Sequence, residues 1–221
     1  MDAAAGTSEG TSRPLWQLLR AIASGDEART SRLLTASPRL ASEASAVGAT
    51  RGSSTPFFFE ETAHYLYAGD TPLHVAAAAY RTDIAKELVR LGANVGARNR
   101  RGAQPLHYAC DGQPASATWD PKAQERVIAF LIRAGANPNS TDKNGVTPLH
   151  RAIRTRCAAA VRALLAHGAD PDRKNGSGST PLHLARLNTG RGGSGSIAAR
   201  EQQQQIIRLL EAHGVARAPS A

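Results

Sequence analysis

The stretch Gly145-Val146-Thr147-Pro148-Leu149-His150-Arg151-Ala152 decides the fold, because three further copies of it occur along the chain. Its Thr-Pro step predicts the start of a helix, since threonine is a good N-cap and proline at the first helical position loses no hydrogen bond. The prolines of the four copies stand at positions 72, 105, 148 and 181, so they are 33, 43 and 33 residues apart. The chain is therefore built from a repeated helical unit.

A second apolar run follows each copy and closes on a glycine, at Gly92, Gly135, Gly168 and Gly214. Glycine suits the left-handed position that ends many helices, so each unit is predicted to hold a pair of helices. The composition agrees: 41% of the residues are hydrophobic and only 5% aromatic, which favours Ala- and Leu-rich helices over a sheet sandwich. Such pairs bury their apolar faces by stacking on one another.

The Thr-Pro-Leu-His-x-Ala motif, repeated at this spacing, resembles the signature of the ankyrin repeat family, whose period is about 33 residues. The resemblance implies an all-α fold, an ankyrin-repeat α-solenoid of stacked helix-turn-helix units with hairpin-like loops. It covers residues 62–215 as four repeats, of which the second and fourth carry inserts between their helices. The repeats are expected at residues 66–98, 99–141, 142–174 and 175–215.

The segments outside the four repeats lack the Thr-Pro-Leu-His element, and one of them, residues 14–41, resembles a degenerate repeat. Residues 14–41 are expected to form a divergent capping helix pair, and residues 1–13 and 216–221 disordered tails. Residues 42–61 are predicted as a loop with a phenylalanine cluster, Phe57-Phe58-Phe59. These rings either close the apolar end of the first repeat or form an exposed hydrophobic anchor.

Histidines and cysteines do not indicate an enzyme. Four of the seven histidines share one repeat position, where the resemblance implies that they tie a helix start to the neighbouring turn; they are His74, His107, His150 and His183. Cys110 and Cys157 are interpreted as small hydrophobic residues, and the glycines of residues 190–195 as a flexible insert rather than a nucleotide site. We expect no catalytic residue, no cofactor and no metal; a catalytic role would need His64 or Cys157 to be reactive.

The net charge of +9 is carried by residues 61–221, since residues 1–60 hold six arginines and six acids. A basic region favours an acidic protein surface, nucleic acid or anionic lipid as partner, and the scattering of the arginines makes nucleic acid unlikely. No stretch approaches the roughly 20 apolar residues of a membrane span, and the N-terminus has no secretory signal. We expect a cytoplasmic monomer.

The resemblance also implies where a partner lies, namely against a concave face made of hairpin tips and first helices. By register, ten residues are expected on that face: Tyr65, Tyr67, Arg98, Arg100, Arg101, Tyr108, Lys143, Arg151, Arg154 and Lys174. Tyrosine and arginine are the residue types that often anchor interfaces. The first hypothesis is a non-enzymatic protein-protein interaction module, a scaffold or adaptor for an acidic partner. The alternatives are electrostatic binding of nucleic acid or anionic lipid, and a merely solvated basic face.

Overall fold

The computed structural model describes residues 12–114, 116, 119–187 and 196–217. The chain divides into two compact units, residues 1–108 and residues 109–221, and each is described by itself. Helix α5 (Pro105–Ala109) ends at the boundary between them. Most of the described chain is helical, which confirms the predicted all-α repeat fold.

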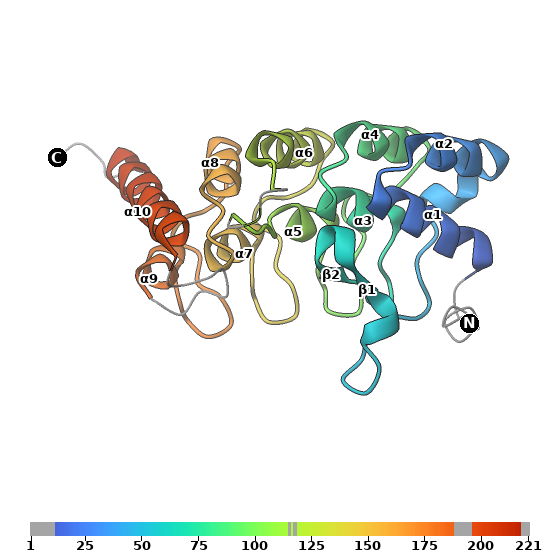
Figure 1. The fold of residues 1–221 in the computed structure, drawn as a ribbon. Helices are drawn as coiled ribbons and strands as arrows, with labels where there is room; N and C mark the ends of the chain where they lie inside the picture. The colour runs from blue at the N-terminus through green and yellow to red at the C-terminus, as the bar shows by residue number, and fades with distance from the viewer. Residues whose placement is uncertain (1–11, 115, 117–118, 188–195, 218–221) are drawn as a thin grey trace. The chain divides into compact units, whose positions relative to one another are not determined.

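The N-terminal unit begins with the helices α1 (Arg13–Ser24) and α2 (Glu27–Ala36), which lie where the sequence predicts a divergent pair (Figure 1). The hydroxyl of Ser12 accepts from the Leu15 amide at the start of α1, so the helix begins inside the predicted tail. Gly25 ends α1 with a left-handed φ of +77°, and Asp26 caps α2. A short 3₁₀-helix, η2 (Pro38–Ala41), follows.

The first motif-bearing pair of this unit consists of α3 (Pro72–Ala78) and α4 (Thr82–Arg90). Thr71 and His74 form a capping box at the start of α3, as the Thr-Pro step predicts. Helix α1 contacts both α2 and α3, and Figure 1 shows α2 and α4 as an outer layer over α1 and α3. Leucine and isoleucine side chains of α1 and α3 fill the space between them; Leu15, Leu18, Leu19, Ile22 and Leu73 are fully buried.

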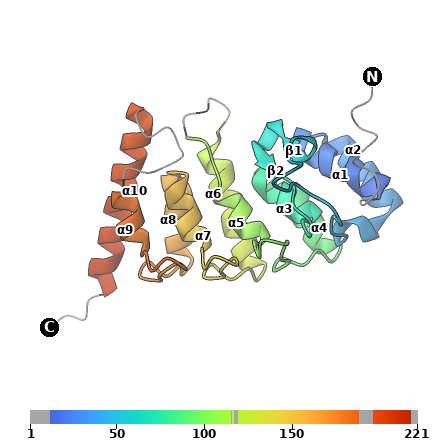
Figure 2. The same cartoon turned by 90° about the horizontal axis from the view of Figure 1, so that it is seen from below.

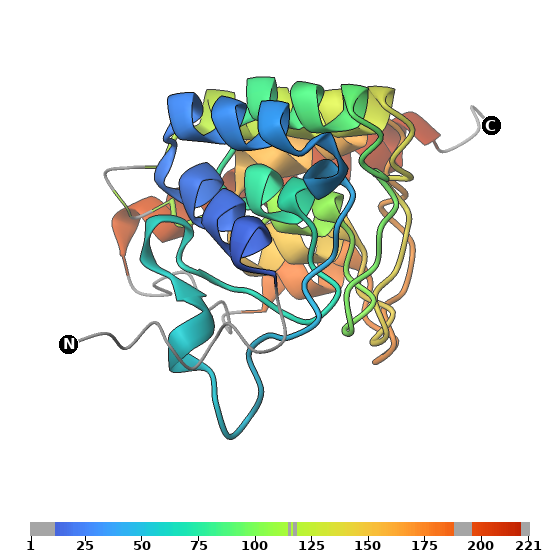
Figure 3. The same cartoon turned by 90° about the vertical axis from the view of Figure 1, so that its right-hand side faces the viewer.

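Residues 54–66 form a small hairpin rather than a plain loop (Figure 3). The 3₁₀-helix η3 (Thr55–Phe57) leads into β1 (Phe58–Phe59), and η4 (Glu60–Thr62) connects it to β2 (His64–Tyr65). The strands are antiparallel, with Phe58 opposite Tyr65 and Phe59 opposite His64. Backbone pairing of two-residue strands leaves no sequence periodicity to detect, so the sequence indicated only a loop.

The phenylalanine cluster packs inward at two of its three positions. Phe57 and Phe59 are 8% and 2% exposed, and their ring centroids lie 6.3 Å and 5.7 Å from that of Trp16 in α1. Both rings are buried, as the first interpretation requires, but the aromatic partner that the structure gives them is Trp16 of α1 and not a residue of the first repeat. The alternative of an exposed anchor is wrong for them, because α1 supplies an aromatic partner that the sequence did not identify.

The C-terminal unit holds α6 (Pro121–Arg133), α7 (Pro148–Arg154), α8 (Ala158–Ala166), α9 (Pro181–Arg186) and α10 (Ile197–Arg217). Helix α8 contacts α6, α7 and α10, and α9 contacts α7 and α10. In neighbouring repeats the second helices α6, α8 and α10 therefore pack on one another, and so do the first helices α7 and α9 (Figure 2). The residues after α5 and after α9 separate the helices of their pairs, where the inserts are predicted.

Both predicted tails are partly replaced by helix. Helix α10 continues to Arg217, two residues into the predicted C-terminal tail. The remainder of that tail (residues 218–221), residues 1–11 of the N-terminal tail, and residues 188–195 with the glycine-rich insert lie outside the described residues.

Candidate functional site

The repeat histidines act as structural links. The Thr71 amide donates to Nδ1 of His74 (3.1 Å), whose Nε2 lies 3.2 Å from the Ala103 carbonyl oxygen in the next turn. In the C-terminal unit the Thr147 amide donates to Nδ1 of His150 (3.3 Å), whose Nε2 lies 3.2 Å from the Ser179 carbonyl. The prediction that these side chains tie a helix start to the neighbouring turn is confirmed for both, so neither imidazole is available for catalysis.

A buried carboxylate organises the N-terminal unit. The Asp70 side chain is fully buried and accepts from the Tyr67 amide (2.7 Å), the Tyr108 hydroxyl (2.8 Å) and the Asn99 amide group (2.9 Å). Three donors satisfy the carboxylate, so its burial is compensated. Sequence reasoning missed this network. Its signal was present, because the other three repeats hold Ala103, Val146 and Ser179 where this one holds Asp70.

This network corrects one predicted site residue. Tyr108 is only 2% exposed, so the expectation that it lies open to a partner is wrong. Its hydroxyl is held by Asp70, and its ring lies 4.1 Å from the His64 ring in a stacked arrangement and 5.1 Å from that of His74. Tyr108 therefore packs against the hairpin through its contact with His64.

His64 lies on β2, beside the buried network. It lines a cavity of about 10 Å³ together with Asp70 and Tyr108, and such a volume holds about one water molecule. Its Nδ1 lies 3.0 Å from the Tyr65 carbonyl oxygen. Its ring also stacks on that of Tyr108, so His64 packs between the hairpin and Tyr108.

Both cysteines are buried free thiols. Burial raises the pKa of Cys110, and it raises the pKa of Cys157 to about 12. Cysteine reacts as the thiolate, so a raised pKa lowers the reactive fraction of both thiols at neutral pH. Among the residues that the structure describes, no group of three or more His, Cys, Asp or Glu side chains has an arrangement that suits a metal ion.

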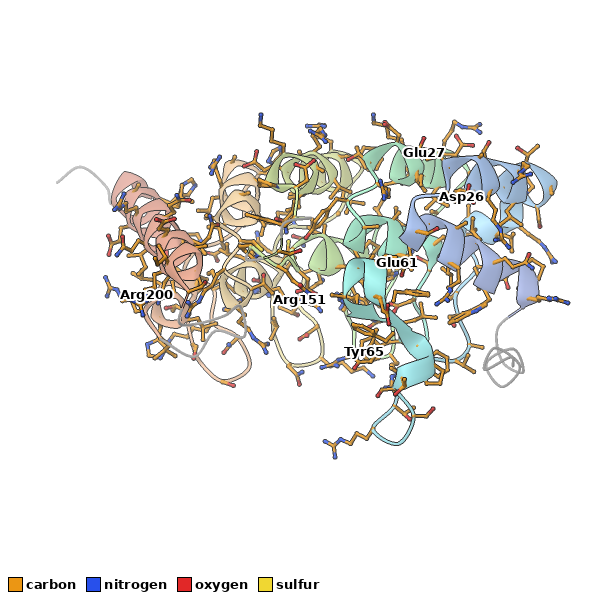
Figure 4. The ribbon with its side chains drawn as sticks, viewed as in Figure 1. Asp26, Glu27, Glu61, Tyr65, Arg151 and Arg200 are labelled. Atoms are coloured by element: carbon orange, nitrogen blue, oxygen red, sulfur yellow. The ribbon has the colours of Figure 1, made fainter. Side chains whose placement is uncertain are left out.

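Five predicted site residues of the N-terminal unit are grouped around the hairpin and the turn at residues 98–102. Tyr65 is 38% exposed on β2 and packs on Phe58, with 4.8 Å between ring centroids (Figure 4). Arg98 is exposed and donates to the Gly102 carbonyl (3.0 Å). Arg100 and Arg101 are exposed, and both guanidiniums lie against the half-buried Tyr67 ring.

In the C-terminal unit, three of the four predicted residues are exposed cations. Lys143 and Lys174 lie in the turns that precede α7 and α9, and Arg154 is the last residue of α7. No ion pair involves these three side chains in the part of the chain that the structure describes. They can therefore bring uncompensated positive charge to a partner.

Arg151 is different from these three. Its Nε and Nη2 lie 3.0 Å and 2.7 Å from the two carboxylate oxygens of Asp111, and its side chain is 21% exposed (Figure 4). The expectation that Arg151 offers an open positive charge is wrong, because a bidentate ion pair already neutralises it and fixes the start of the insert. The sequence did not show this pair, whose members are 40 positions apart.

No helix of the described residues is long and apolar enough to cross a bilayer. Three family models match the chain: ankyrin repeats (3 copies) over residues 44–119, ankyrin repeat over residues 101–143, and ankyrin repeats (many copies) over residues 131–185. No curated protein matches it. Ankyrin repeats generally serve as protein-protein interaction modules and are typically non-enzymatic. The motif, the helix pairs and the matched models agree, and the chain belongs to the ankyrin repeat family.

Proposed function

We propose that this protein is a non-enzymatic scaffold or adaptor that binds an acidic protein partner through the turns preceding its first helices. The observation that supports this most is the set of aromatic and basic side chains on and near those turns. In the N-terminal unit they are Tyr65, the half-buried Tyr67, Arg98, Arg100 and Arg101; in the C-terminal unit they are Lys143, Lys174 and, at the end of α7, Arg154. Exposed cations of this kind steer an acidic partner and set its register, whereas aromatic contacts supply affinity.

The roles of the described histidines and cysteines are compatible with such a module. Among the described residues, His74 and His150 cap helices, His64 packs on Tyr108, and both thiols are buried. A cytoplasmic, monomeric scaffold fits these features, and positioning or blocking a partner needs no reactive group.

A capture experiment with matched charge changes tests the proposal. The test variant carries Arg100→Glu and Arg101→Glu; the control carries Arg29→Glu and Arg32→Glu on the exposed side of α2, so both lose the same charge. After nuclease treatment of the lysate, we expect one protein to be captured by the parent and by the control but not by the test variant. Equal capture by all three chains would contradict the proposed surface.

A parallel sample without nuclease separates the remaining alternative. Capture that appears only when nucleic acid is present would replace the protein-binding proposal by electrostatic binding of nucleic acid, whose affinity falls steeply with salt. Circular dichroism of each variant, before and after urea unfolding, checks that the substitutions leave the fold intact.

A further inference from the structure

Two arginine side chains converge on one tyrosine in the N-terminal unit. The guanidinium carbons of Arg100 and Arg101 lie 5.4 Å and 5.0 Å from the centroid of the Tyr67 ring. Nη1 of Arg101 also donates to the Tyr67 hydroxyl (3.0 Å), and Nη2 of Arg100 donates to the Ala49 carbonyl. Tyr67, Arg100 and Arg101 are called the Arg–Tyr cluster below.

The backbone fixes this cluster. The Arg100 amide donates to the Ala68 carbonyl (2.7 Å), and the Arg101 amide donates to Oδ1 of Asn99 (2.9 Å). Gly69, with a φ of +87°, permits the close approach of the two turns, because a Cβ there would lie 2.8 Å from Cα of Asn99. Asn99 in turn donates to Asp70, so the buried network positions both arginines.

The charges of the cluster are not neutralised within the described residues. Neither Arg100 nor Arg101 forms an ion pair there, and the sequence around them, residues 94–104, holds no acid. The carboxylate of Asp70 is buried and committed to Tyr67, Asn99 and Tyr108. Two like charges held together repel each other, and an anion that binds both removes this repulsion.

The donors that remain suit a carboxylate. A guanidinium has five N–H donors in a planar fork, and each of these two uses one on a neutral oxygen described above. Arginine forks bind carboxylates through two parallel hydrogen bonds. Because the Tyr67 ring already restricts both side chains, less conformational entropy is lost when an anion binds.

We infer that the Arg–Tyr cluster is a carboxylate-binding site for Asp or Glu side chains of an acidic protein segment. This inference rests on the proposed function and names the chemistry of its partner. Nucleic acid is disfavoured here, because binding of single strands relies on aromatic rings that are open for base stacking. The Tyr67 ring is half-buried and carries two guanidiniums instead.

The test measures fluorescence anisotropy of a labelled decaglutamate peptide with the full chain. The variant Arg100→Gln, Arg101→Gln removes both forks, and Arg29→Gln, Arg32→Gln on α2 is the control of equal charge. We expect the cluster variant to bind at least tenfold more weakly than the parent, and the control to bind within twofold of it. The amide signals of Arg100 and Arg101 should shift on titration of the parent in an NMR spectrum.

Several outcomes would overturn the inference. Equal weakening in both variants would show a diffuse charge effect, and tighter binding of a ten-nucleotide DNA strand than of decaglutamate would show the wrong class of partner. If the parent captures a protein but binds no decaglutamate, the carboxylate-binding site is contradicted and the proposed function is not. If the parent captures no protein and still binds decaglutamate through the cluster, the proposed function falls and the carboxylate site remains.

Discussion

The helix pair α7–α8 closes with a short turn, whereas residues 110–120 separate the helices of the pair α5–α6. In both pairs the carbonyl of the alanine that ends the repeat motif lies in the interior and needs a donor. In the short turn the Cys157 amide donates to the Ala152 carbonyl (2.9 Å). In the pair with an insert, the side-chain amide of Gln124 donates to the Ala109 carbonyl (3.0 Å).

The other two motif-bearing pairs repeat this contrast. The Arg81 amide donates to the Ala76 carbonyl (2.9 Å) where the turn is short, and the Gln203 side chain donates to the Ala185 carbonyl (2.8 Å) where an insert is present. In both inserted pairs a glutamine of the second helix supplies the donor that a backbone amide supplies in the short turns. An insert is therefore compatible with the stack only when the freed carbonyl receives a new donor.

The largest expected effect comes from removing this replacement donor. Gln124→Met keeps the size of the side chain but leaves the Ala109 carbonyl and the Trp119 indole N–H, now bonded to Gln124, without partners. We expect the free energy of unfolding to fall by about 1–3 kcal/mol, the usual cost of a buried unsatisfied group. Urea unfolding followed by circular dichroism measures it.

Two matched substitutions test whether the loss of stability depends on how deeply the glutamine is buried. Gln203→Met should cost less, because Gln203 is half-buried and water reaches its partners, and the exposed Gln205→Met should change stability by less than about 0.5 kcal/mol. Equal losses for Gln124→Met and Gln205→Met would show that the glutamine contact does not hold the insert-bearing pair together.

A smaller effect, of opposite sign, is expected in the short turn. Arg156 has a left-handed φ of +56° and is 3% exposed. Its Nη1 and Nη2 find no hydrogen-bond partner in the described ranges of the chain. The corresponding turn between α1 and α2 has Gly25 at this position. We expect Arg156→Gly to raise the free energy of unfolding by about 1 kcal/mol, because it removes backbone strain and an unpaired buried charge.

Arg156→Ala separates the two causes, since alanine removes the charge but keeps the strained Cβ. A gain for glycine that exceeds the gain for alanine would identify backbone strain as the larger cause. A loss of stability in both variants, measured by the same urea unfolding, would mean that the aliphatic part of Arg156 contributes more packing than its charge and conformation cost.

The contrast between short and inserted pairs was partly visible in the sequence. Counting back eleven positions from the closing glycines gives Arg81, Gln124, Cys157 and Gln203, so both inserted repeats, and only they, hold glutamine there. The Thr-Pro-Leu-His motif was enough to predict the helix starts, because N-capping is a local interaction.

The candidate surface was harder to predict. Register placed Arg100, Arg101 and Tyr67 on neighbouring turns, but it also placed Tyr108 and Arg151 in the open. Whether a side chain at such a position is free depends on one distant partner, Asp70 for Tyr108 and Asp111 for Arg151. A repeat pattern describes what the copies share, and these contacts arise where one copy departs from the others.

The smallest expected effect is a change in the pH dependence of stability, tested at His150, the capping histidine of a short pair, with the exposed His183 of an inserted pair for comparison. Burial lowers the pKa of His150 below its ordinary value of 6.5; the Ser179 carbonyl raises it, and the nearby Arg173 and Arg154 lower it. Between the two pKa values the unfolded chain binds more protons than the native one, so the free energy of unfolding falls as the pH drops below about 6.5. Above that pH both states are neutral and this contribution vanishes.

We therefore expect His150→Gln to lose less stability than the parent between pH 7.5 and pH 5.5. His183→Gln, at the exposed equivalent position in the α9–α10 pair, is the matched control variant. Urea unfolding at both pH values measures the difference, and identical pH dependence of His150→Gln and the parent would show that this buried imidazole does not couple protonation to folding.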